Sequence, residues 1–537
     1  MENREIIHPA MIDSEIFFRD KFEAEPRHYN QIVKASSCDG GKAYSDDKNG
    51  SEIKHDLVII DILSGNKQDD QIEFKTNRVI VLLLFTEFMQ NVSFSIFAPF
   101  LPIIVTKHGI SQRYFGIMFW VYSVSCVIGS PIVGKHLNTY GRRRIMQAGV
   151  IVETLPFLGY LLIDYLTPEF TFGICGKYTF LSWFIILRGI QGIGMSMVQT
   201  STFSILTQIY PEDVNFVTSW METAGGIGLA GGPLIGVVLY ELGGITLIFL
   251  LLFTISMLIA FFIKIYLPEY KSTTQDSEDE SDESDEVTYK QLLSNKGVIF
   301  ANLWVFLSVT QYTFFDPFLS NYLHENFELS YETSAYFFIV LGIGNIISCL
   351  LAPYTLKHIS KKRSWIVAAV LLGVCTMMFW DPFHANSHSS LLLLLIALFL
   401  AGFVNSYLII PAMGEMIDSW KQMADQKNTD SDATKILKLE IINDKCSGLY
   451  SMSFELGEIV GPLVGNEIYT EAGFSSICNI HGIILIGFGV IYFLTCDKFN
   501  VSDTIFSALK NIFRRKRQFA TFVDEVIVNE SVDASES

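Results

Sequence analysis

The residues whose chemistry stands out in this sequence are charged side chains inside long apolar segments. Six are acids and one is an arginine: Glu87, Glu153, Glu222, Asp316, Glu455, Glu458 and Arg188. A charge inside a bilayer is unfavourable and marks a pathway for ions, protons or substrate. Because desolvation disfavours the charged form of a carboxylate, such acids can bind protons near physiological pH. In a water-filled cavity they attract cations, so the pattern predicts transport in which a proton and a cation compete for the same acids.

The segments that carry these charges are long enough to cross a membrane. Hydrophobic residues make up 50% of the 537 residues, and charged residues make up 18%. A membrane-spanning helix needs about 20 apolar residues. The sequence therefore predicts an all-α polytopic membrane protein with twelve transmembrane helices at 78–104, 114–136, 145–166, 179–208, 217–241, 245–267, 297–322, 333–356, 364–382, 390–413, 447–470 and 475–495.

Polar segments divide the chain into two six-helix halves, expected at 78–267 and 297–495. We expect cytosolic tails at 1–77 and 496–537, because Lys and Arg cluster after helices 2, 8 and 12 and such clusters stay in the cytosol. The run QDSEDESDESDE lies in an acidic cytosolic linker expected at 268–296. A cytosolic insertion is expected at 414–446, and we assign no function to it.

A glycine-rich element recurs in the two halves. Helix 5 carries GGPLIGVVLY and helix 11 carries VGPLVGNEIY, which share the pattern G-P-L-x-G-x-x-x-Y. Small residues let helix backbones approach closely, and the proline allows a kink. The residues of the helix-5 element are Gly228, Gly232, Pro233 and Gly236. Glu222 precedes this element, and we predict that it forms a gating or structural pair with Arg188 of helix 4.

Signatures of soluble catalysis are missing from the sequence, which contains no GxxxxGK[ST], HExxH or GxSxG motif. The eight cysteines show no metal-ligand spacing. We therefore expect no enzymatic activity, no metal, no cofactor, and transport driven by a gradient rather than by ATP. The expected partners are a small-molecule substrate, protons and the lipid bilayer, without nucleic acid, and the protein is expected to be a monomer.

The loop between helices 2 and 3 reads GKHLNTYGRRR. It resembles the signature loop of the major facilitator superfamily, G-x-L-A-D-R-x-G-R-R-R, whose charged residues connect helix ends and the two halves. Asn138 stands where the family has its acid and Thr139 where it has its first arginine, so we expect a weakened charged latch. The matching residues are Gly134, Gly141, Arg142, Arg143 and Arg144.

Within that superfamily the membrane region resembles solute carrier family 18, especially its polyamine-transporter branch. The likeness is carried by the stretch from LRGIQGIGMSM to SWMETAGGIGLAGGP and by SGLYSMSFELGEIVGPLVGNEIYTEAGF. It implies the major facilitator fold and exchange of protons for an organic cation, an amine or polyamine, by alternating access. It favours a vesicle or another endomembrane, and the plasma membrane stays open as an alternative.

The resemblance also orders the candidate sites for substrate and protons. FFDPFL in helix 7 resembles the family's acid-proline pair, which makes Asp316 the first candidate. Glu87 is the second, because helices 1 and 7 line the cavity in this superfamily. Gln90 and Asn91 stand where the family's monoamine transporters carry an Asp-Asn pair. In helix 10, Asn405 stands near a family aspartate, which weakens the case for monoamine recognition.

Three further acids are weighed from their positions alone. Glu455 and Glu458 lie on one face of helix 11 at i, i+3 spacing, and both are kept as candidates. Glu153 is expected to be peripheral or close to a neighbouring helix.

Two other functions fit the sequence. One is a facilitator of a neutral or anionic metabolite that works by proton symport or uniport. The other is a non-transporting sensor or scaffold, which the long tails and the altered loop at Asn138 and Thr139 would suit.

Overall fold

The computed structural model describes residues 69–96, 115–166, 173–268, 287–329, 331–379, 387–425 and 432–495. Contacts divide the chain into two compact units, Met1–Ile72 and Glu73–Ser537, and the second unit contains the membrane helices. Within the described ranges the regular structure is entirely helical.

The first half is built from α4 (Asp69–Ser95), α6 (Phe115–Tyr140), α7 (Arg142–Leu166), α8 (Gly173–Ile209) and α9 (Val214–Tyr266). α9 contains two helices, because Gly243 and Gly244 depart from helical geometry and Gly244 has a φ of 68°. Glycine adopts this left-handed conformation without the steric penalty that other residues meet. The break falls between the windows predicted at 217–241 and 245–267, so the half has six helical segments in its described part.

The second half follows the short helix α10 (Tyr289–Leu292). It contains α11 (Lys296–Thr313), α12 (Phe315–Phe327), α13 (Tyr331–Leu356), α14 (Lys361–Met377), α15 (Ser387–Asp425) and α16 (Asp432–Thr495). α16 also contains two helices, divided at Gly473 with a φ of 77°. We call its first part, before Gly473, helix 11. α11 and α12 together match the window predicted at 297–322.

α11 and α12 are bent by 41° relative to one another. Pro317 lies in the first turn of α12 and has no N–H to donate to the preceding helix, which accounts for the bend.

The segment at 414–446 differs from the insertion that the sequence predicted. Residues 414–425 continue α15, and residues 432–446 form the start of helix 11.

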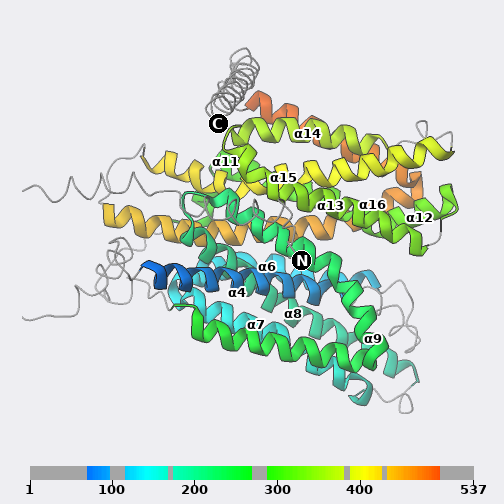
Figure 1. Cartoon of the computed structure of the whole chain (residues 1–537), viewed down its shortest axis with the longest axis horizontal. Helices are drawn as coiled ribbons and strands as arrows, with labels where there is room; N and C mark the ends of the chain where they lie inside the picture. The colour runs from blue at the N-terminus through cyan, green and yellow to red at the C-terminus, as the bar shows by residue number, and fades with distance from the viewer. Residues whose placement is uncertain are drawn as a thin grey trace, which may run out of the picture. The chain divides into compact units, whose positions relative to one another are not determined.

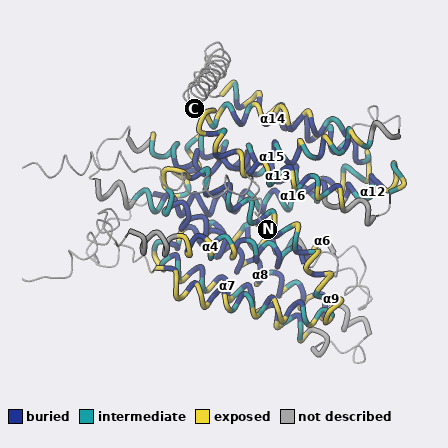
Figure 2. Tube along the Cα trace, in the orientation of Figure 1, coloured by how far each residue is buried: buried dark blue, intermediate teal, exposed yellow. Residues whose placement is uncertain are grey.

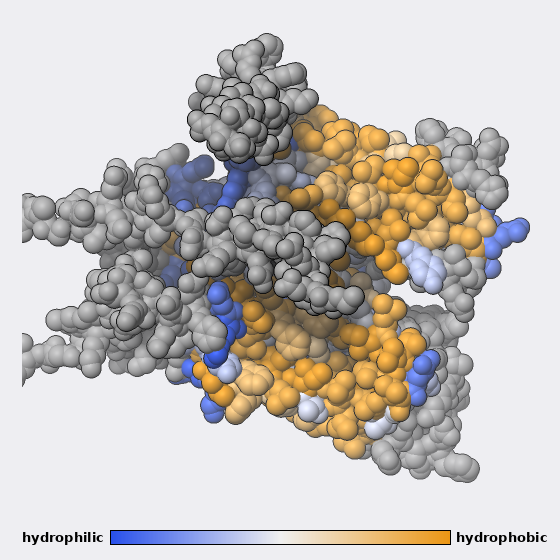
Figure 3. Space-filling model, viewed as in Figure 1, coloured by the Kyte–Doolittle hydropathy of each residue, from blue (hydrophilic) through white to orange (hydrophobic). Residues whose placement is uncertain are grey.

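The prediction of an all-α polytopic protein is confirmed. In the described part of the chain, six helices are long and apolar enough to cross a membrane, with the two-part α9 and α16 each counted once. Figure 1 shows α4, α6, α7, α8 and α9 in one lobe and α11 to α15 in the other. Buried residues line the interior of the helix bundle in Figure 2, and Figure 3 shows an outer surface that is mostly apolar, as contact with lipid requires.

The first part of α9, before Gly243, is called helix 5, and its glycines pack it tightly against α4. Gly228 lies against the backbone carbonyl of Phe88, and Gly232 lies against Ser95 and the carbonyl of Val92. A Cβ atom at Gly228 would overlap the Phe88 carbonyl. The side chain must therefore be absent for the two backbones to come this close.

The recurring element makes the same contact in the second half. Gly457 and Gly461 of helix 11 lie against the carbonyl oxygens of Phe306 and Thr310 on α11. Helix 5 thus packs on the first helix of its half as helix 11 packs on the first helix of the other. The sequence repeat corresponds to one packing interaction used twice.

Replacement of Gly228 by alanine should destabilise the protein, because the added methyl group meets backbone rather than a movable side chain. We expect a loss of about 1 to 3 kcal/mol, the usual effect of overpacking. Gly231→Ala is the matched control, since a Cβ at Gly231 meets only Ile235 at 3.9 Å. Thermal unfolding of both purified variants in detergent measures the difference. Equal melting temperatures would contradict this packing.

Candidate functional site

The two halves are joined by a buried ion pair at one end of the bundle. We call this the basic end, because it carries Arg142, Arg143, Lys264 and Lys357. The Arg142 Nε atom lies 2.9 Å from Asp444 Oδ1, and its Nη2 atom lies 2.9 Å from Asp444 Oδ2. Both residues are buried. This two-point contact, the Arg142–Asp444 latch, connects the start of α7 to helix 11 with the geometry that guanidinium and carboxylate groups favour.

Polar groups of α8 complete the latch. The Ser204 hydroxyl donates to Asp444 Oδ1. The Thr207 hydroxyl donates to Asn443 Oδ1 at 2.8 Å, and the Asn443 amide donates to the Ser204 carbonyl at 3.0 Å. A buried ion pair is stable only when its remaining hydrogen-bonding groups are satisfied. Three helices of the membrane body therefore meet at Asp444.

The acid of this latch is Asp444 of the other half, which the sequence did not indicate, and the weakening expected from Asn138 and Thr139 stays a prediction. Asn138 lies in α6, and its Oδ1 atom is buried without a hydrogen-bond partner among the described residues. Gly134 lies against the Asp444 carbonyl, and Gly141 has a φ of 87° where the chain turns into α7. The signature-loop glycines thus allow the close approach that brings Arg142 to Asp444. Arg143 donates to the Lys264 carbonyl within the first half.

The end of the linker lies beside the latch. The Tyr289 hydroxyl of α10 donates to the Pro131 carbonyl of α6 at 2.6 Å, and the Lys445 ammonium donates to the Val287 carbonyl. The Lys445 Nζ atom also lies 5.8 Å from the centre of the Tyr289 ring. Burial raises the pKa of Tyr289, so its hydroxyl remains a donor. This segment therefore contacts α6 and helix 11 together.

A second set of contacts at the basic end joins α9 to α13. The Lys357 ammonium lies 3.2 Å from Asp213, and both side chains are exposed. Deeper in the bundle, the Ser219 hydroxyl donates to the Cys349 carbonyl. Within the second half, Lys361 lies 2.5 Å from Asp418. The basic end is thus closed in two places: helix 11 contacts α6 and the start of α7, and α13 contacts α9.

Glu222 lies at the interface between the halves. Its Oε1 atom accepts a hydrogen bond of 2.8 Å from the Tyr450 hydroxyl of helix 11. Tyr450 is fully buried, and its ring centre lies 4.8 Å from that of Phe203 on α8. The pair with Arg188 that the sequence predicted stays a prediction. The gating or structural role of Glu222 likewise stays a prediction, and Tyr450 is a partner that the sequence did not indicate.

Glu87 and Glu153 lie next to Glu222 in the first half. The Asn91 amide donates to Glu87 Oε1 at 3.3 Å, and the Gln90 amide donates to Glu153 Oε2 at 3.0 Å. Glu87 interacts electrostatically with both Glu222 and Glu153. Its Oε2 atom is buried without a hydrogen-bond partner among the described residues. Glu153 is buried in this network, in contact with α4 through Gln90, which agrees with the second of its two expected positions, close to a neighbouring helix.

Glu455 and Glu458 extend the group of acids into the second half. Glu455 is buried and interacts electrostatically with Glu458 and with Glu87. The Ser123 hydroxyl of α6 donates to Glu458 Oε2 at 3.3 Å. The structure therefore brings together acids from both halves in what we call the acid cluster: Glu87, Glu153, Glu222, Glu455 and Glu458.

Arg188 is a fully buried basic residue of α8. Its Nη1 atom donates to Gln191 Oε1 at 3.2 Å, and its guanidinium carbon lies 5.7 Å from the Tyr122 ring centre and 5.9 Å from that of Phe184. Cation–π contacts of this kind stabilise a desolvated guanidinium. Aromatic rings and an amide group thus contact Arg188.

The predicted site in helix 7 is only partly described. Asp316 lies in the first turn of α12, directly after the bend, and its side chain lies outside the described residues. Its role as the first candidate for substrate or proton stays a prediction. Asn405 is buried on α15, where its Oδ1 atom accepts a hydrogen bond of 2.5 Å from Ser308 of α11.

Two residues of helix 11 that contact the first half, Tyr450 and Asp444, were not predicted from the sequence. Tyr450 lies in the apolar part of helix 11, where an aromatic residue gives no signal of its own. Asp444 was assigned to the insertion at 414–446. An acid within one turn of the start of an apolar helix, together with the RRR of the signature loop, is the signal that would have indicated it.

Comparisons with known proteins agree with this architecture. The family model described as "Major Facilitator Superfamily" matches residues 83–424. The chain belongs to this superfamily. It is therefore a multi-pass membrane protein and a secondary transporter rather than an enzyme, and its twelve helices form the superfamily's two six-helix halves.

The chain is also similar to individual members of the superfamily. The chain is 26% identical over 394 residues to the MFS-type transporter SLC18B1 of Mus musculus. This match covers 73% of this chain and 80% of that protein. It is 23% identical to the synaptic vesicular amine transporter of Rattus norvegicus over 65% of this chain and 64% of that protein. A bacterial homologue of the iron transporter ferroportin, solved in an outward-facing state, has a TM-score of 0.60 at 14% identity, covering 77% of this chain and 98% of that chain.

Replacement of Asp444 by asparagine should strongly destabilise the closed structure, because it leaves the Arg142 guanidinium buried without its counter-charge. We expect a loss of about 3 to 5 kcal/mol. Asp213→Asn, which breaks the exposed pair with Lys357, is the control and should change stability by about 1 kcal/mol or less. Thermal unfolding in detergent compares the two. If both variants melt alike, the latch does not have this role.

Proposed function

We propose that the protein exchanges protons for an organic cation, of the amine or polyamine class, by alternating access. The observation that carries this proposal is the acid cluster, which both halves contribute to and which lies where they meet. Protons and an organic cation are the ligands that neutralise such a cluster. The likeness to a relative named as a vesicular amine transporter supports the amine class.

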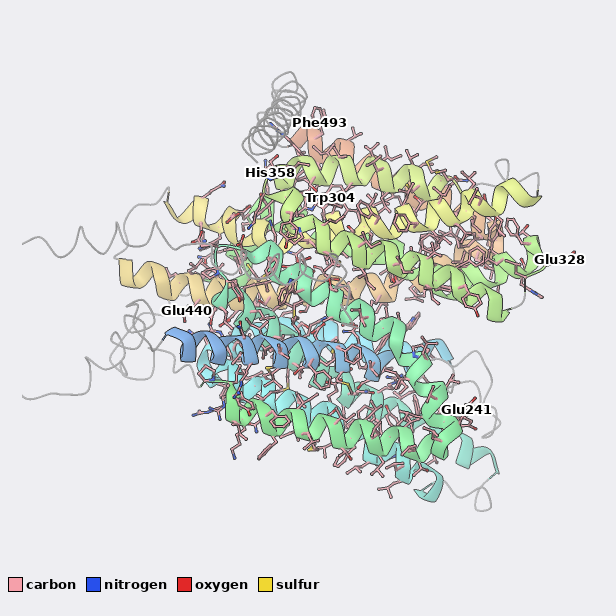
Figure 4. All side chains as sticks on the ribbon, in the orientation of Figure 1. Glu241, Trp304, Glu328, His358, Glu440 and Phe493 are labelled. Carbon is pink, nitrogen blue, oxygen red and sulfur yellow. The ribbon has the colours of Figure 1, made fainter. Side chains whose placement is uncertain are left out.

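Access to the acid cluster is expected from the end opposite the latch. The hydrogen bonds and ion pairs described between the halves lie between the basic end and the level of Glu458. Figure 3 shows a notch between the two lobes at the other end, and in Figure 4 that end carries Glu241 and Glu328, whereas Glu440 lies at the basic end. This arrangement favours a state closed at the basic end.

The charge distribution suggests which compartment each end faces. Basic residues near helix ends remain in the cytosol, which would place the basic end and both termini there. The opposite end would then face the lumen of a vesicle or another acidic compartment. Protons from the lumen would displace the cation from the acids, and return of the halves would release the protons to the cytosol. The pathway lies between the halves of one chain, which is consistent with a monomer.

Transport by purified protein in liposomes tests the proposal. With an acidic interior, we expect labelled spermidine or serotonin to accumulate inside while the pH gradient decreases. Glu87→Gln should reduce the exchange rate roughly tenfold or more, since it removes a charged contact of about 1.5 to 3 kcal/mol. Glu241→Gln, an exposed acid outside the cluster, should leave exchange unchanged.

Asp316→Asn extends the test to helix 7. Loss of cation transport with an unchanged melting temperature would support Asp316 as a substrate or proton site. Failure of both cations to accumulate, together with proton-coupled uptake of a neutral or anionic solute, would overturn cation exchange and favour a metabolite facilitator.

A further inference from the structure

Helix 11 contacts the first half at three levels. Asp444 binds Arg142 at the basic end, Tyr450 binds Glu222, and Glu458 accepts from Ser123. With a rise of about 1.5 Å per residue, Tyr450 lies about 9 Å along the helix from Asp444 and about 12 Å from Glu458. Tyr450 is therefore the contact that lies between the latch and the acids deeper in the bundle.

The strength of the middle contact depends on the charge of Glu222. A phenol hydroxyl donates strongly to a carboxylate, and hydrogen bonds to charged groups are roughly twice as strong as those between neutral groups. When Glu222 binds a proton, its carboxyl group becomes neutral and this hydrogen bond weakens. When Glu222 contacts a cation, it keeps its charge and remains a strong acceptor.

The groups that face Glu222 come from three other helices. Tyr450 approaches from helix 11, Glu87 interacts with Glu222 from α4, and the Cys349 thiol does so from α13. Glu153 of α7 interacts electrostatically with Glu87 and accepts a hydrogen bond from the Gln90 amide of α4. Two neighbouring carboxylates repel one another, so a cation or a proton is needed to neutralise the pair of Glu87 and Glu222.

We propose that Tyr450 is a positioning residue that couples the charge of Glu222 to closure of the basic end. The inference rests on the proposed exchange of protons and cations. Protonation of Glu222 weakens a contact that holds helix 11 on the first half, which shifts the equilibrium toward opening of the basic end. A bound cation leaves this contact intact, so the loaded protein stays closed there. The two ligands of the acid cluster thereby favour opposite states.

A native cysteine reports on this equilibrium. Cys446 lies on helix 11 between Asp444 and Tyr450, and it is fully buried and carries a free thiol. When the basic end opens, the thiol becomes accessible to a hydrophilic maleimide. The labelling rate of Cys446 in the full-length protein, divided by its rate in denaturant at the same pH, measures opening without any substrate. Cys446→Ser identifies the labelled site.

We expect the normalised labelling rate of the unmodified protein to rise roughly tenfold when the pH is lowered from 8 to 5.5. This factor corresponds to the loss of one hydrogen bond to a charged group. Tyr450→Phe keeps the ring contact with Phe203 and removes only the hydroxyl. It should label roughly tenfold faster at pH 8 and show little further rise at pH 5.5. Glu222→Gln, which fixes the neutral form, should behave in the same way and tests the same bond if Tyr450→Phe does not fold.

Tyr492→Phe is the matched control, because it removes a hydroxyl from a buried tyrosine in the last helix of the second half. It should show the labelling of the unmodified protein at both pH values. The inference is overturned if Tyr450→Phe and Glu222→Gln retain the full rise with acid, or if the unmodified protein shows no rise. Because labelling needs no substrate, a failure of cation exchange in liposomes would be distinguished from a failure of this inference.

Discussion

The bidentate ion pair between Arg142 and Asp444 is the interaction on which the rest of the arrangement depends. It joins the two halves in a buried setting where removal of either charge is strongly unfavourable. The same burial makes the pair a two-state element, because separation of the halves must expose both groups to water. A latch of this kind favours one closed geometry over a continuum of partly open ones.

Rigid halves are needed for such a latch to act on a distant site. The glycine faces of helix 5 and helix 11 provide this rigidity, since each lies against the backbone of the first helix of its half. Helix 11 therefore moves together with the second half while it carries Asp444, Tyr450, Glu455 and Glu458. A change in charge among these acids acts on the same rigid element that carries the latch.

The sequence predicted the fold closely because its signals are local. The length of the apolar segments predicted the helices, and the predicted gaps at 242–244 and 471–474 contain the breaks at Gly244 and Gly473. The acids at Glu87, Glu222, Glu455 and Glu458 were found because a charge in apolar sequence is conspicuous.

The partners of these residues could not be predicted in the same way. Tyr450 pairs with Glu222 across a separation of 228 residues, and Asp444 with Arg142 across 302. Such pairs depend on how the halves dock, which no periodicity in the chain encodes. Asp444 was further obscured because polar helix ends resemble loops in composition.

The central claim is that the two halves rock around the acid cluster. Distances between spin labels at the two ends of the bundle test this claim most directly. One pair of labels at Tyr140→Cys and Ile359→Cys would report on the basic end, and another at Glu241→Cys and Glu325→Cys on the opposite end; all four residues are exposed. Acidification from pH 8 to pH 5.5 should lengthen the first distance and shorten the second. Two distances that change together, or that do not respond to pH, would contradict the account.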